Sequence, residues 1–295
     1  MKIDQSPAFS SGNKNTDWPW NAEIPYIPQT MPDGSAWPKI SIVTPSYNQA
    51  EFIEETIRSV ICQGYPNLEY IIIDGGSTDG SVEIIKKYEE YLTYWVSEPD
   101  QGQAHAINKG LRKTNGEIIA WINSDDTYLP NTFLRISKLF KDKSQRLVFG
   151  KAHYINDKSQ IIGTYNSFPL PNGYQKFRYW RGWGIPQATV FFNKNLLDDY
   201  GYIDESYNYS FDYELFIRYS QHLQFTFLNE FFANYRIHEK SKTGDWEKNK
   251  QLFFSDCEII NSKYLEKIPH HFIKLTLDRL IIYPVSNIFK RIVEK

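Results

Sequence analysis

Short apolar runs alternate with segments of helical periodicity between residues 40 and 123. The apolar runs, which predict strands, cover residues 40–44, 70–74, 94–96 and 118–123. Helical spacing of apolar residues follows the first run, recurs around residues 82–88 and returns at 104–111. Repeated β-α alternation with strands apolar on both faces predicts an α/β protein with an open, mostly parallel sheet flanked by helices.

The first helix has a candidate start signal. Asn48 is followed three residues later by Glu51, a spacing that resembles a capping box. Beyond it, Phe52, Ile53, Thr56, Ile57, Val60 and Ile61 fall on one helical face.

The pattern is less regular after residue 131. We expect a hairpin from residues 147–154 and 160–165, a buried strand at 188–192, a helix at 212–221, and two strands at 225–228 and 233–237. Residues 1–38 are repeatedly broken by proline and predict an extended arm. The predicted organisation is therefore an arm (1–38), two halves of one domain (39–130 and 131–245) and a C-terminal helical extension (246–295).

Charge and cysteine content narrow the function classes. The 295 residues carry a formal net charge of -2, so no global positive field favours nucleic acid as a partner. The two cysteines, Cys62 and Cys257, lack metal-site or redox spacing, and no run approaches the roughly 18 apolar residues of a spanning helix. These features predict a soluble, cytoplasmic protein.

The C-terminal tail, residues 265–295, contains two amphipathic segments separated by Pro284, with several basic residues beside the apolar face. Packing against the parent domain explains this pattern, and peripheral contact with the inner face of an anionic membrane is the alternative.

Polar clusters follow three of the predicted strands, at residues 44–48, 74–79 and 123–126. Open α/β sheets bind ligands outside the carboxyl ends of their strands, where the strand order switches. We therefore expect the three loops to converge on one crevice.

Two of these loops suggest a metal-diphosphate. Asp125 and Asp126 directly follow an apolar strand, and carboxylates there suit Mg²⁺ or Mn²⁺, which take oxygen ligands. An Asp-rich turn that caps the next helix is the structural alternative. The Gly-rich loop 74–80 offers backbone amides to an anion or ribose, although such loops are also ordinary strand-to-helix turns.

The ordered set of motifs is more specific than any one of them. Pro-Ser-Tyr-Asn after the first strand, Asp-Gly-Gly-Ser-Thr-Asp-Gly after the second, Asp100-Gln101-Gly102-Gln103 before the third helix and Asn-Ser-Asp-Asp after the fourth strand occur in this order. The series resembles the inverting glycosyltransferases of family 2, which have the GT-A fold, and the likeness covers about residues 40–242.

The resemblance implies a donor site for a nucleoside-diphosphate sugar of the UDP, dTDP or GDP type. Base and ribose contacts would come from Thr44, Pro45, Tyr47 and Asp74, with the loop shaped by Gly76, Ser77 and Asp79. Other donor contacts would come from Asp100, Gln103, Asn108, Asn123 and Ser124. Asp125 matches the metal-binding carboxylate of the family's Asp-x-Asp signature, whose first Asp is replaced by Asn123.

The second half carries the implied catalytic and acceptor groups. Asp212 matches the base that deprotonates the acceptor hydroxyl, and helix capping is its alternative role. His238 would ligate the metal or bind a phosphate, and Arg236 or Lys242 would offset leaving-group charge. Trp183, Gln187 and Glu214 would face the acceptor, which is expected to be a saccharide or lipid-linked saccharide.

The implied activity is an inverting, metal-dependent glycosyl or hexosyl transfer in cell-surface polysaccharide or glycan synthesis. Two alternatives stay open. One is a sugar nucleotidyltransferase, whose Gly-rich Arg/Lys loop is not found in residues 44–50. The other is a catalytically silent subunit that binds a sugar nucleotide or glycan, which Asn123 favours and the retained Asp125, Asp212 and His238 disfavour.

Overall fold

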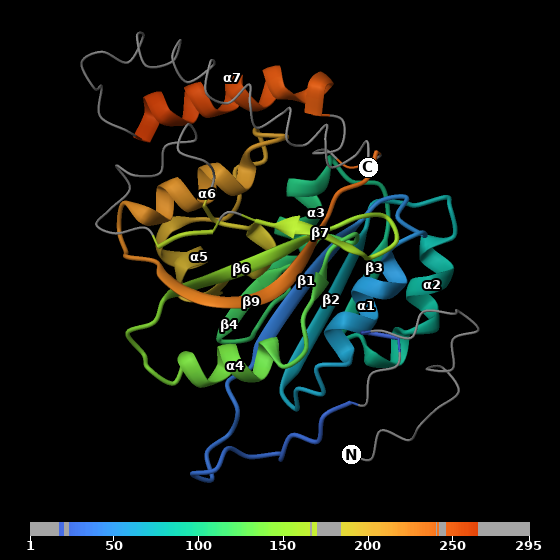
Figure 1. Cartoon of the computed structure of the whole chain (residues 1–295), viewed down its shortest axis with the longest axis vertical. Coiled ribbons are helices and arrows are strands. Elements are labelled where there is room, and N and C mark those ends of the chain that lie inside the picture. The colour runs from blue at the N-terminus through green and yellow to red at the C-terminus, as the bar shows by residue number, and fades with distance from the viewer. Residues whose placement is uncertain are drawn as a thin grey trace.

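A mixed sheet forms the centre of the computed structural model, which describes residues 18–20, 24–165, 167–169, 184–239, 241 and 246–264 (Figure 1). The described strands follow the order β3-β2-β1-β4-β8-β6-β9-β5, with β7 paired to β6. The predicted α/β class is confirmed.

The first half of the sheet is parallel. It contains β1 (Ile40–Ser46), β2 (Leu68–Asp74), β3 (Tyr94–Ser97) and β4 (Ile118–Trp121). Ser46 pairs with Asp74, and Asp74 pairs with Ser97, so the carboxyl ends of three strands are aligned. The chain moves outward from β1 to β2 and β3, then crosses back to β4 on the other side of β1, which places the switch of strand order between β1 and β4.

Three helices connect these strands. They are α1 (Ile53–Ile61), α2 (Ser81–Lys87) and α3 (Gln103–Leu111). Because side chains of a strand alternate between faces, Ile42 and Ile72 join the core beneath α1 and α2, while Val43 and Ile73 join the core beneath α3. α3 lies close to the sheet, since a Cβ on its Gly110 would come 2.4 Å from Val43 Cγ1.

The expected capping box is wrong. Asn48 has a left-handed backbone (φ 51°), and α1 begins only at Ile53, after Phe52. The Asn48 side chain instead accepts a hydrogen bond from the Thr78 amide in the next loop. Asn48 therefore connects two loops by a hydrogen bond and does not cap the helix.

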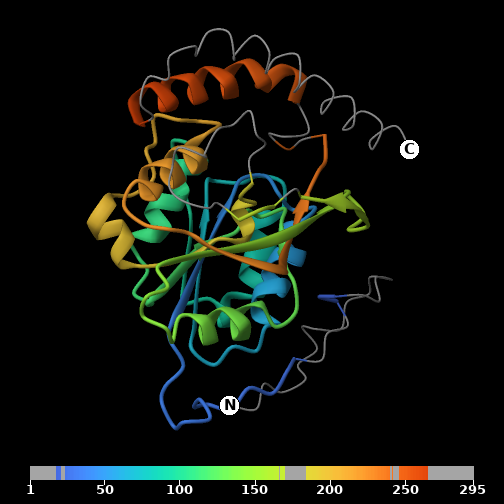
Figure 2. The same cartoon turned by 60° about the vertical axis from the view of Figure 1, so that its left-hand side comes forward.

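The described part of the N-terminal arm covers the α1 face of the sheet. Ile27, Met31 and Trp37 are buried in the same core as the strands and α1. The same end of the molecule contains α4 (Thr132–Leu139), as both views show (Figures 1 and 2).

The second half of the sheet is mixed in direction. The predicted hairpin is confirmed as β6 (Leu147–Ile155) and β7 (Ile161–Thr164). The expected buried strand is divided into a short 3-10 helix (Gln187–Thr189) and β8 (Phe191–Asn193). A two-residue strand, β5 (Thr127–Tyr128), was not predicted.

The two strands expected at 225–228 and 233–237 are one long strand, β9 (Thr226–Arg236). Polar Asn229 and Glu230 interrupt the apolar pattern but are exposed in the middle of the strand. Register shifts against β6 between Phe149 and Ala152 accommodate the irregular stretch. The interruption in the sequence therefore reflects exposure and bulging, not a turn.

Helices complete the second half: α5 (Asn195–Tyr200), α6 (Phe211–Ser220) and α7 (Trp246–Tyr264). α6 packs over the sheet through Phe216, which stacks on Trp121 at the end of β4. α7 lies beyond α6, farther from the sheet (Figures 1 and 2). Within the described residues, no helix has both the length and the apolar character needed to cross a bilayer. The tail segments expected at 265–295 lie outside the described residues.

Candidate functional site

The loops after β1 and β2 are tied together at the carboxyl edge of the sheet. The Asn48 amide donates to Ser77 Oγ (2.8 Å), and the Ala50 amide donates to Asp79 Oδ2 (2.9 Å). Gly76 has a φ of 83°, which favours glycine at this turn. Gly76, Ser77 and Asp79 therefore shape the loop as the sequence suggests.

Asp74 holds this loop from below. Its carboxylate is buried and accepts hydrogen bonds from the amides of Gly76 (3.1 Å) and Ser77 (2.8 Å) and from the hydroxyls of Ser77 (2.5 Å) and Ser97 (2.6 Å). Four bonds are about what a carboxylate accepts. In this structure Asp74 serves the loop, so a direct contact with a base would require one of these bonds to be exchanged.

The expectation for Thr44 is corrected. Thr44 is fully buried, and its Oγ1 lies 3.1 Å from the Tyr70 hydroxyl. The alternation along β1 places its side chain on the α1 face, away from the edge. Pro45 is buried as well, whereas Tyr47 is 62% exposed at the end of the strand. Of these three residues, Tyr47 alone offers an open aromatic face.

Asp100 lies against the same edge. A Cβ at Gly75 would come 2.6 Å from Asp100 Oδ2 and 3.3 Å from the Tyr47 ring, so only glycine leaves room for this carboxylate. The other oxygen, Oδ1, accepts the Gly102 amide (2.7 Å). The structure therefore brings Tyr47 and Asp100 together over Gly75.

Asn123 links α3 to the loop after β4. Its Oδ1 accepts a hydrogen bond from Gln103 Nε2 (2.7 Å), and its Nδ2 donates to Asp126 Oδ2 (3.3 Å). An aspartate at 123 could not donate to Asp126 and would add a second charge beside it. Gln103 and Asn123, predicted on separate motifs, are neighbours, and Ser124 is buried next to them.

The side chains of Asp125 and His238 are in contact. Asp125 Oδ2 lies 3.1 Å from His238 Nε2, and their side chains are 17% and 6% exposed. The Phe52 ring packs against the imidazole with 4.5 Å between centroids. The structure thus brings together the two residues that the sequence analysis names as metal ligands, and their metal role stays a prediction.

The Asp125–His238 pair fits adjacent positions of an octahedral ion. Two such ligands at about 2.1 Å from Mg²⁺, or slightly farther from Mn²⁺, lie about 3 Å apart. Within the described residues, no group of three or more His, Cys, Asp or Glu side chains is placed to hold a metal. Substrate phosphates and water would therefore have to complete the coordination shell, as is common for these ions.

Asp126 is a buried carboxylate. Burial raises the pKa of Asp126 well above its ordinary value, and the adjacent Asp125 carboxylate raises it further. Hydrogen bonds from the Arg236 amide (2.9 Å) and Asn123 act in the opposite direction. Asp126 thus supports the loop from inside, while Asp125 is the partly exposed carboxylate.

Asp212 lies in the first turn of α6 and is partly exposed. Ser210 occupies the N-cap position, and Asp212 accepts the Tyr213 amide through Oδ1 (2.8 Å), so its side chain also satisfies an amide of the first helical turn. Burial raises the pKa of Tyr165 well above its usual range, and nearby Tyr154, Tyr235 and Asp212 add to that shift. Asp212 is therefore close to the aromatic cluster that includes Tyr235, three residues before His238.

Asn108 is engaged elsewhere. Its amide nitrogen donates to the Ile203 carbonyl (2.8 Å) and to Glu205 Oε1 (2.6 Å), while its oxygen accepts the Ile203 amide (3.1 Å). The side chain is buried and joins α3 to the segment before α6. The expected approach to the donor is replaced by this structural contact.

Two expected acceptor residues also have structural roles. Gln187 is buried and donates to the Trp121 carbonyl (2.9 Å) at the end of β4. Glu214 is 1% exposed and forms a two-point ion pair with Arg218 (2.8 and 2.9 Å), while Tyr264 donates to it (2.6 Å). Trp183 and Lys242 lie outside the described residues.

Arg236 lies in the protein interior. Its side chain is fully buried and pairs with Glu55 (2.8 Å), which corrects the expectation that it offsets leaving-group charge. Glu55 and Ser159 were missed by the sequence reasoning. Glu55 is a charge beside an apolar helical face, which is a weak signal, and nothing local distinguishes Ser159.

Comparison with known proteins identifies the family. The family model described as "Glycosyl transferase family 2" matches residues 41–201. The chain belongs to glycosyltransferase family 2. This family-2 chain is 28% identical to an uncharacterized glycosyltransferase of Rickettsia typhi over 225 residues. The aligned segment covers 70% of this chain and 66% of the relative.

A second relative matches a shorter segment. It is a putative teichuronic acid biosynthesis glycosyltransferase of Bacillus subtilis, TuaG, 40% identical over 94 residues, or 31% of this chain and 37% of the relative. The family-2 chain thus spans two thirds or less of the length of these relatives.

Solved structures share its fold. S. aureus TarS (residues 1–349), in complex with UDP-GlcNAc, has a TM-score of 0.55 and 19% identity, over 69% of this chain and 60% of that one. The mannosyltransferase PcManGT of Pyrobaculum calidifontis, in complex with GDP-Man and Mn²⁺, has a TM-score of 0.54 and 20% identity, over 78% and 67%. The family-2 chain therefore has the GT-A fold of these glycosyltransferases.

Proposed function

We propose that this family-2 glycosyltransferase moves a sugar from a nucleoside-diphosphate sugar to an acceptor hydroxyl, with inversion at the anomeric carbon. The observation that carries the proposal is the contact between Asp125 and His238 (3.1 Å), made beside Gln103 and Asn123 at the switch of strand order. This is where an open α/β sheet binds its ligand.

The donor base would stack on the exposed ring of Tyr47, next to the Asp100 carboxylate. The diphosphate would lie toward Asp125 and His238. Bound Mn²⁺ or Mg²⁺ would offset negative charge on the departing diphosphate. Asp125 and His238 supply two of its ligands in this proposal, and Phe52 packs against the imidazole and holds it in place.

Asp212 is the proposed base. It takes the proton of the acceptor hydroxyl as the hydroxyl oxygen forms a bond to the anomeric carbon, and the bond from that carbon to the diphosphate oxygen breaks on the opposite face. The first turn of α6 favours the negative charge that Asp212 needs for this role.

The substrate class is inferred from the relatives. A UDP, dTDP or GDP sugar is proposed as donor, since TarS is solved with UDP-GlcNAc and PcManGT with GDP-Man. A saccharide or lipid-linked saccharide is the proposed acceptor, and the likeness to TuaG favours a role in cell-surface polysaccharide synthesis. We place the reaction in the cytoplasm, which the unpaired thiols of Cys62 and Cys257 favour.

Donor turnover tests the proposal directly. The full chain is incubated with UDP, dTDP and GDP sugars, with and without Mn²⁺, and products are identified by mass spectrometry. Release of a nucleoside diphosphate that depends on Mn²⁺ is expected. In a second incubation, with a nucleoside triphosphate and a sugar 1-phosphate, release of pyrophosphate would instead indicate a nucleotidyltransferase. Ligand binding by thermal shift without hydrolysis or transfer would indicate a silent binding subunit.

A further inference from the structure

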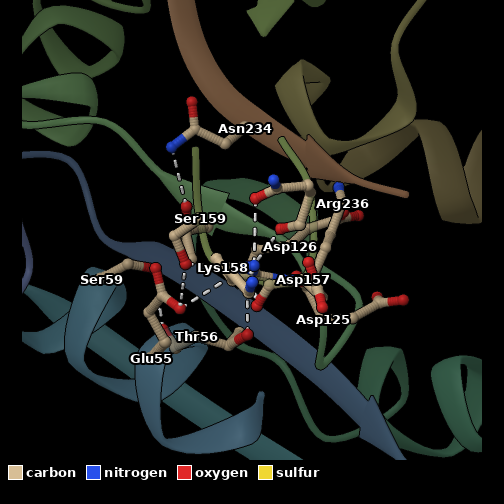
Figure 3. Close-up of polar contacts among 12 residues, drawn as sticks. Glu55, Thr56, Ser59, Asp125, Asp126, Asp157, Lys158, Ser159, Asn234 and Arg236 are labelled. Carbon is tan, nitrogen blue, oxygen red and sulfur yellow. Dashed lines mark hydrogen bonds and ion pairs between the residues drawn. The ribbon is translucent and has the colours of Figure 1, made fainter. Parts of the chain in front are cut away.

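Arg236 is a buried cation at the centre of a polar network (Figure 3). All three guanidinium nitrogens donate hydrogen bonds. Nε bonds the Asp125 carbonyl (2.7 Å), Nη2 bonds Glu55 Oε2 (2.8 Å), and Nη1 bonds the Asn156 carbonyl (2.9 Å) and Ser159 Oγ (2.9 Å). One side chain thereby joins α1, the loop after β4, and the turn between β6 and β7.

Arg236 forms hydrogen bonds with both aspartates of the loop after β4. While Nε bonds the main-chain carbonyl of Asp125, the Arg236 amide donates to Asp126 Oδ1 (2.9 Å). His238 follows two residues later in the chain. Arg236 therefore connects the backbone that carries one member of the Asp125–His238 pair to the backbone that carries the other.

Helix α1 and the residue that precedes it, Phe52, support this connection from one side. Glu55 accepts from Arg236 and from Ser159 Oγ (2.8 Å), and Thr56 Oγ1 donates to the Asp126 carbonyl (2.7 Å). The Phe52 ring lies under both the guanidinium (4.8 Å) and the imidazole of His238 (4.5 Å). The loop after β4 is thus supported by Thr56 and Arg236 directly, while Glu55 and Phe52 contact Arg236.

We infer that Arg236 is a positioning residue, which acts with Glu55 and Ser159 to set the spacing of Asp125 and His238. This inference rests on the proposed metal role of that pair. A lysine at 236 would keep the positive charge but carries one nitrogen in place of three. One ammonium group cannot reach the Asp125 carbonyl, Glu55 and Ser159 together, because the planar guanidinium of Arg236 spans the distance between them. The carbonyl of Asp125 and the oxygen of Ser159 would then lose their fixed donor.

Arg58 provides a matched control. It is a fully buried arginine on the same helix as Glu55, and it bonds the Tyr88 hydroxyl (3.2 Å) and the Trp20 carbonyl (3.1 Å). Like Arg236, its guanidinium lies over an aromatic ring, that of Trp20 (5.0 Å). Arg58→Lys therefore tests the cost of losing a buried guanidinium away from the Asp125–His238 pair.

Two readouts separate positioning from stability. The first is the Cε1–H signal of His238 in carbon-13 NMR of the metal-free protein, assigned with His238→Gln. The second is the affinity for Mn²⁺ in the presence of UDP, GDP or dTDP, measured from the electron paramagnetic resonance of free Mn²⁺. Arg236→Lys should move the His238 signal and weaken Mn²⁺ binding about tenfold or more, as expected for a lost supporting contact.

Arg58→Lys should lower the melting temperature and leave both readouts unchanged. If Arg236→Lys fails to fold, Ser159→Ala takes its place, since it removes one hydroxyl from the network. Ser159→Ala should also move the His238 signal and weaken Mn²⁺ binding. An unmoved His238 signal in both variants would overturn the inference. Failure of the wild type to bind Mn²⁺ with any of the three nucleotides would overturn the proposed function, while the His238 signal would still decide the role of Arg236.

Discussion

Asp125 Oδ2 and His238 Nε2 lie 3.1 Å apart although 113 residues separate them in the chain. The contact depends on the pairing of β5 with β9, in which Thr127 lies opposite Asn234, because Asp125 lies two residues before β5 and His238 two residues after β9. If both side chains bind one ion, replacing either one should cause most of the loss of Mn²⁺ affinity that replacing both causes.

A double-mutant cycle on this pair follows. Asp125→Asn and His238→Gln should each raise the Mn²⁺ concentration needed for half-maximal donor hydrolysis, and the double variant should be less impaired than the sum of the two. Coupling of about 0.5–3 kcal/mol is typical of groups in contact. His222→Gln, a histidine stacked on Tyr200, is the control and should not change the requirement. Strict additivity would argue against a shared ion.

Asp212→Asn should separate catalysis from binding. The amide cannot take the acceptor proton, and general-base catalysis contributes about 10²- to 10⁴-fold, so turnover should fall by that order. Nucleotide affinity, measured by isothermal titration calorimetry, should stay unchanged because Asp212 is on α6, outside the donor loops. Asp204→Asn, in the segment before α6, should retain turnover. Equal turnover by wild type and Asp212→Asn would exclude the residue as the base.

Sequence reasoning located the first half of the fold well. Apolar runs and helical spacing report local burial, so β1 to β4, α2 and α3 came out within two or three residues. The family motifs named Asp125 and His238 as separate candidates, and their contact is a finding of the structure. The long strand β9 was divided in two because Asn229 and Glu230 are exposed on a bulged strand, and periodicity cannot distinguish such exposure from a turn.

Burial and partner choice were harder to predict than position. Thr44, Asn108 and Glu214 stand in the expected segments, yet each side chain is directed into a structural contact. A motif fixes where a residue lies along the strand or helix, whereas the partner is fixed by segments distant in sequence. Arg236 shows this most clearly, since its partners come from α1, the β4 loop and the β6–β7 turn.

Gly75→Ala should weaken nucleotide binding. The added methyl would come 2.6 Å from Asp100 Oδ2, so the carboxylate must move away from the Tyr47 ring, where the donor base is proposed to bind. We expect a several-fold higher dissociation constant for the preferred nucleoside diphosphate. Gly163→Ala is the control, because its Cβ would make only an ordinary contact with Tyr154 (3.6 Å). Unchanged affinity in Gly75→Ala would remove Asp100 from the base site.

Glu69 gives a pH-dependent prediction at the opposite end of the sheet. It is buried on β2, bonded by the Ser41 hydroxyl and the Asn115 amide (2.8 Å), with Lys39 3.3 Å away. Burial alone would raise the pKa of Glu69, but these partners outweigh it and hold the pKa below its ordinary value. A carboxyl with a lowered folded-state pKa stabilises the protein above its unfolded pKa of about 4.3, and that stability is lost as pH falls through the folded value.

Glu69→Gln should therefore be less stable than wild type by about 1.5–3 kcal/mol at pH 7, the usual range for hydrogen bonds to a charged group. The gap should begin to narrow as pH falls below about 4.3, where the carboxyl of the unfolded chain takes up a proton, and should close as pH falls through the lower pKa of the folded carboxyl. Urea unfolding of both proteins from pH 3 to pH 7 measures the difference in unfolding free energy and its change with pH. Glu83→Gln, an exposed position on α2, should follow wild type throughout. A gap that stays constant with pH would mean that Glu69 stabilises β2 through packing, with no contribution from its charge.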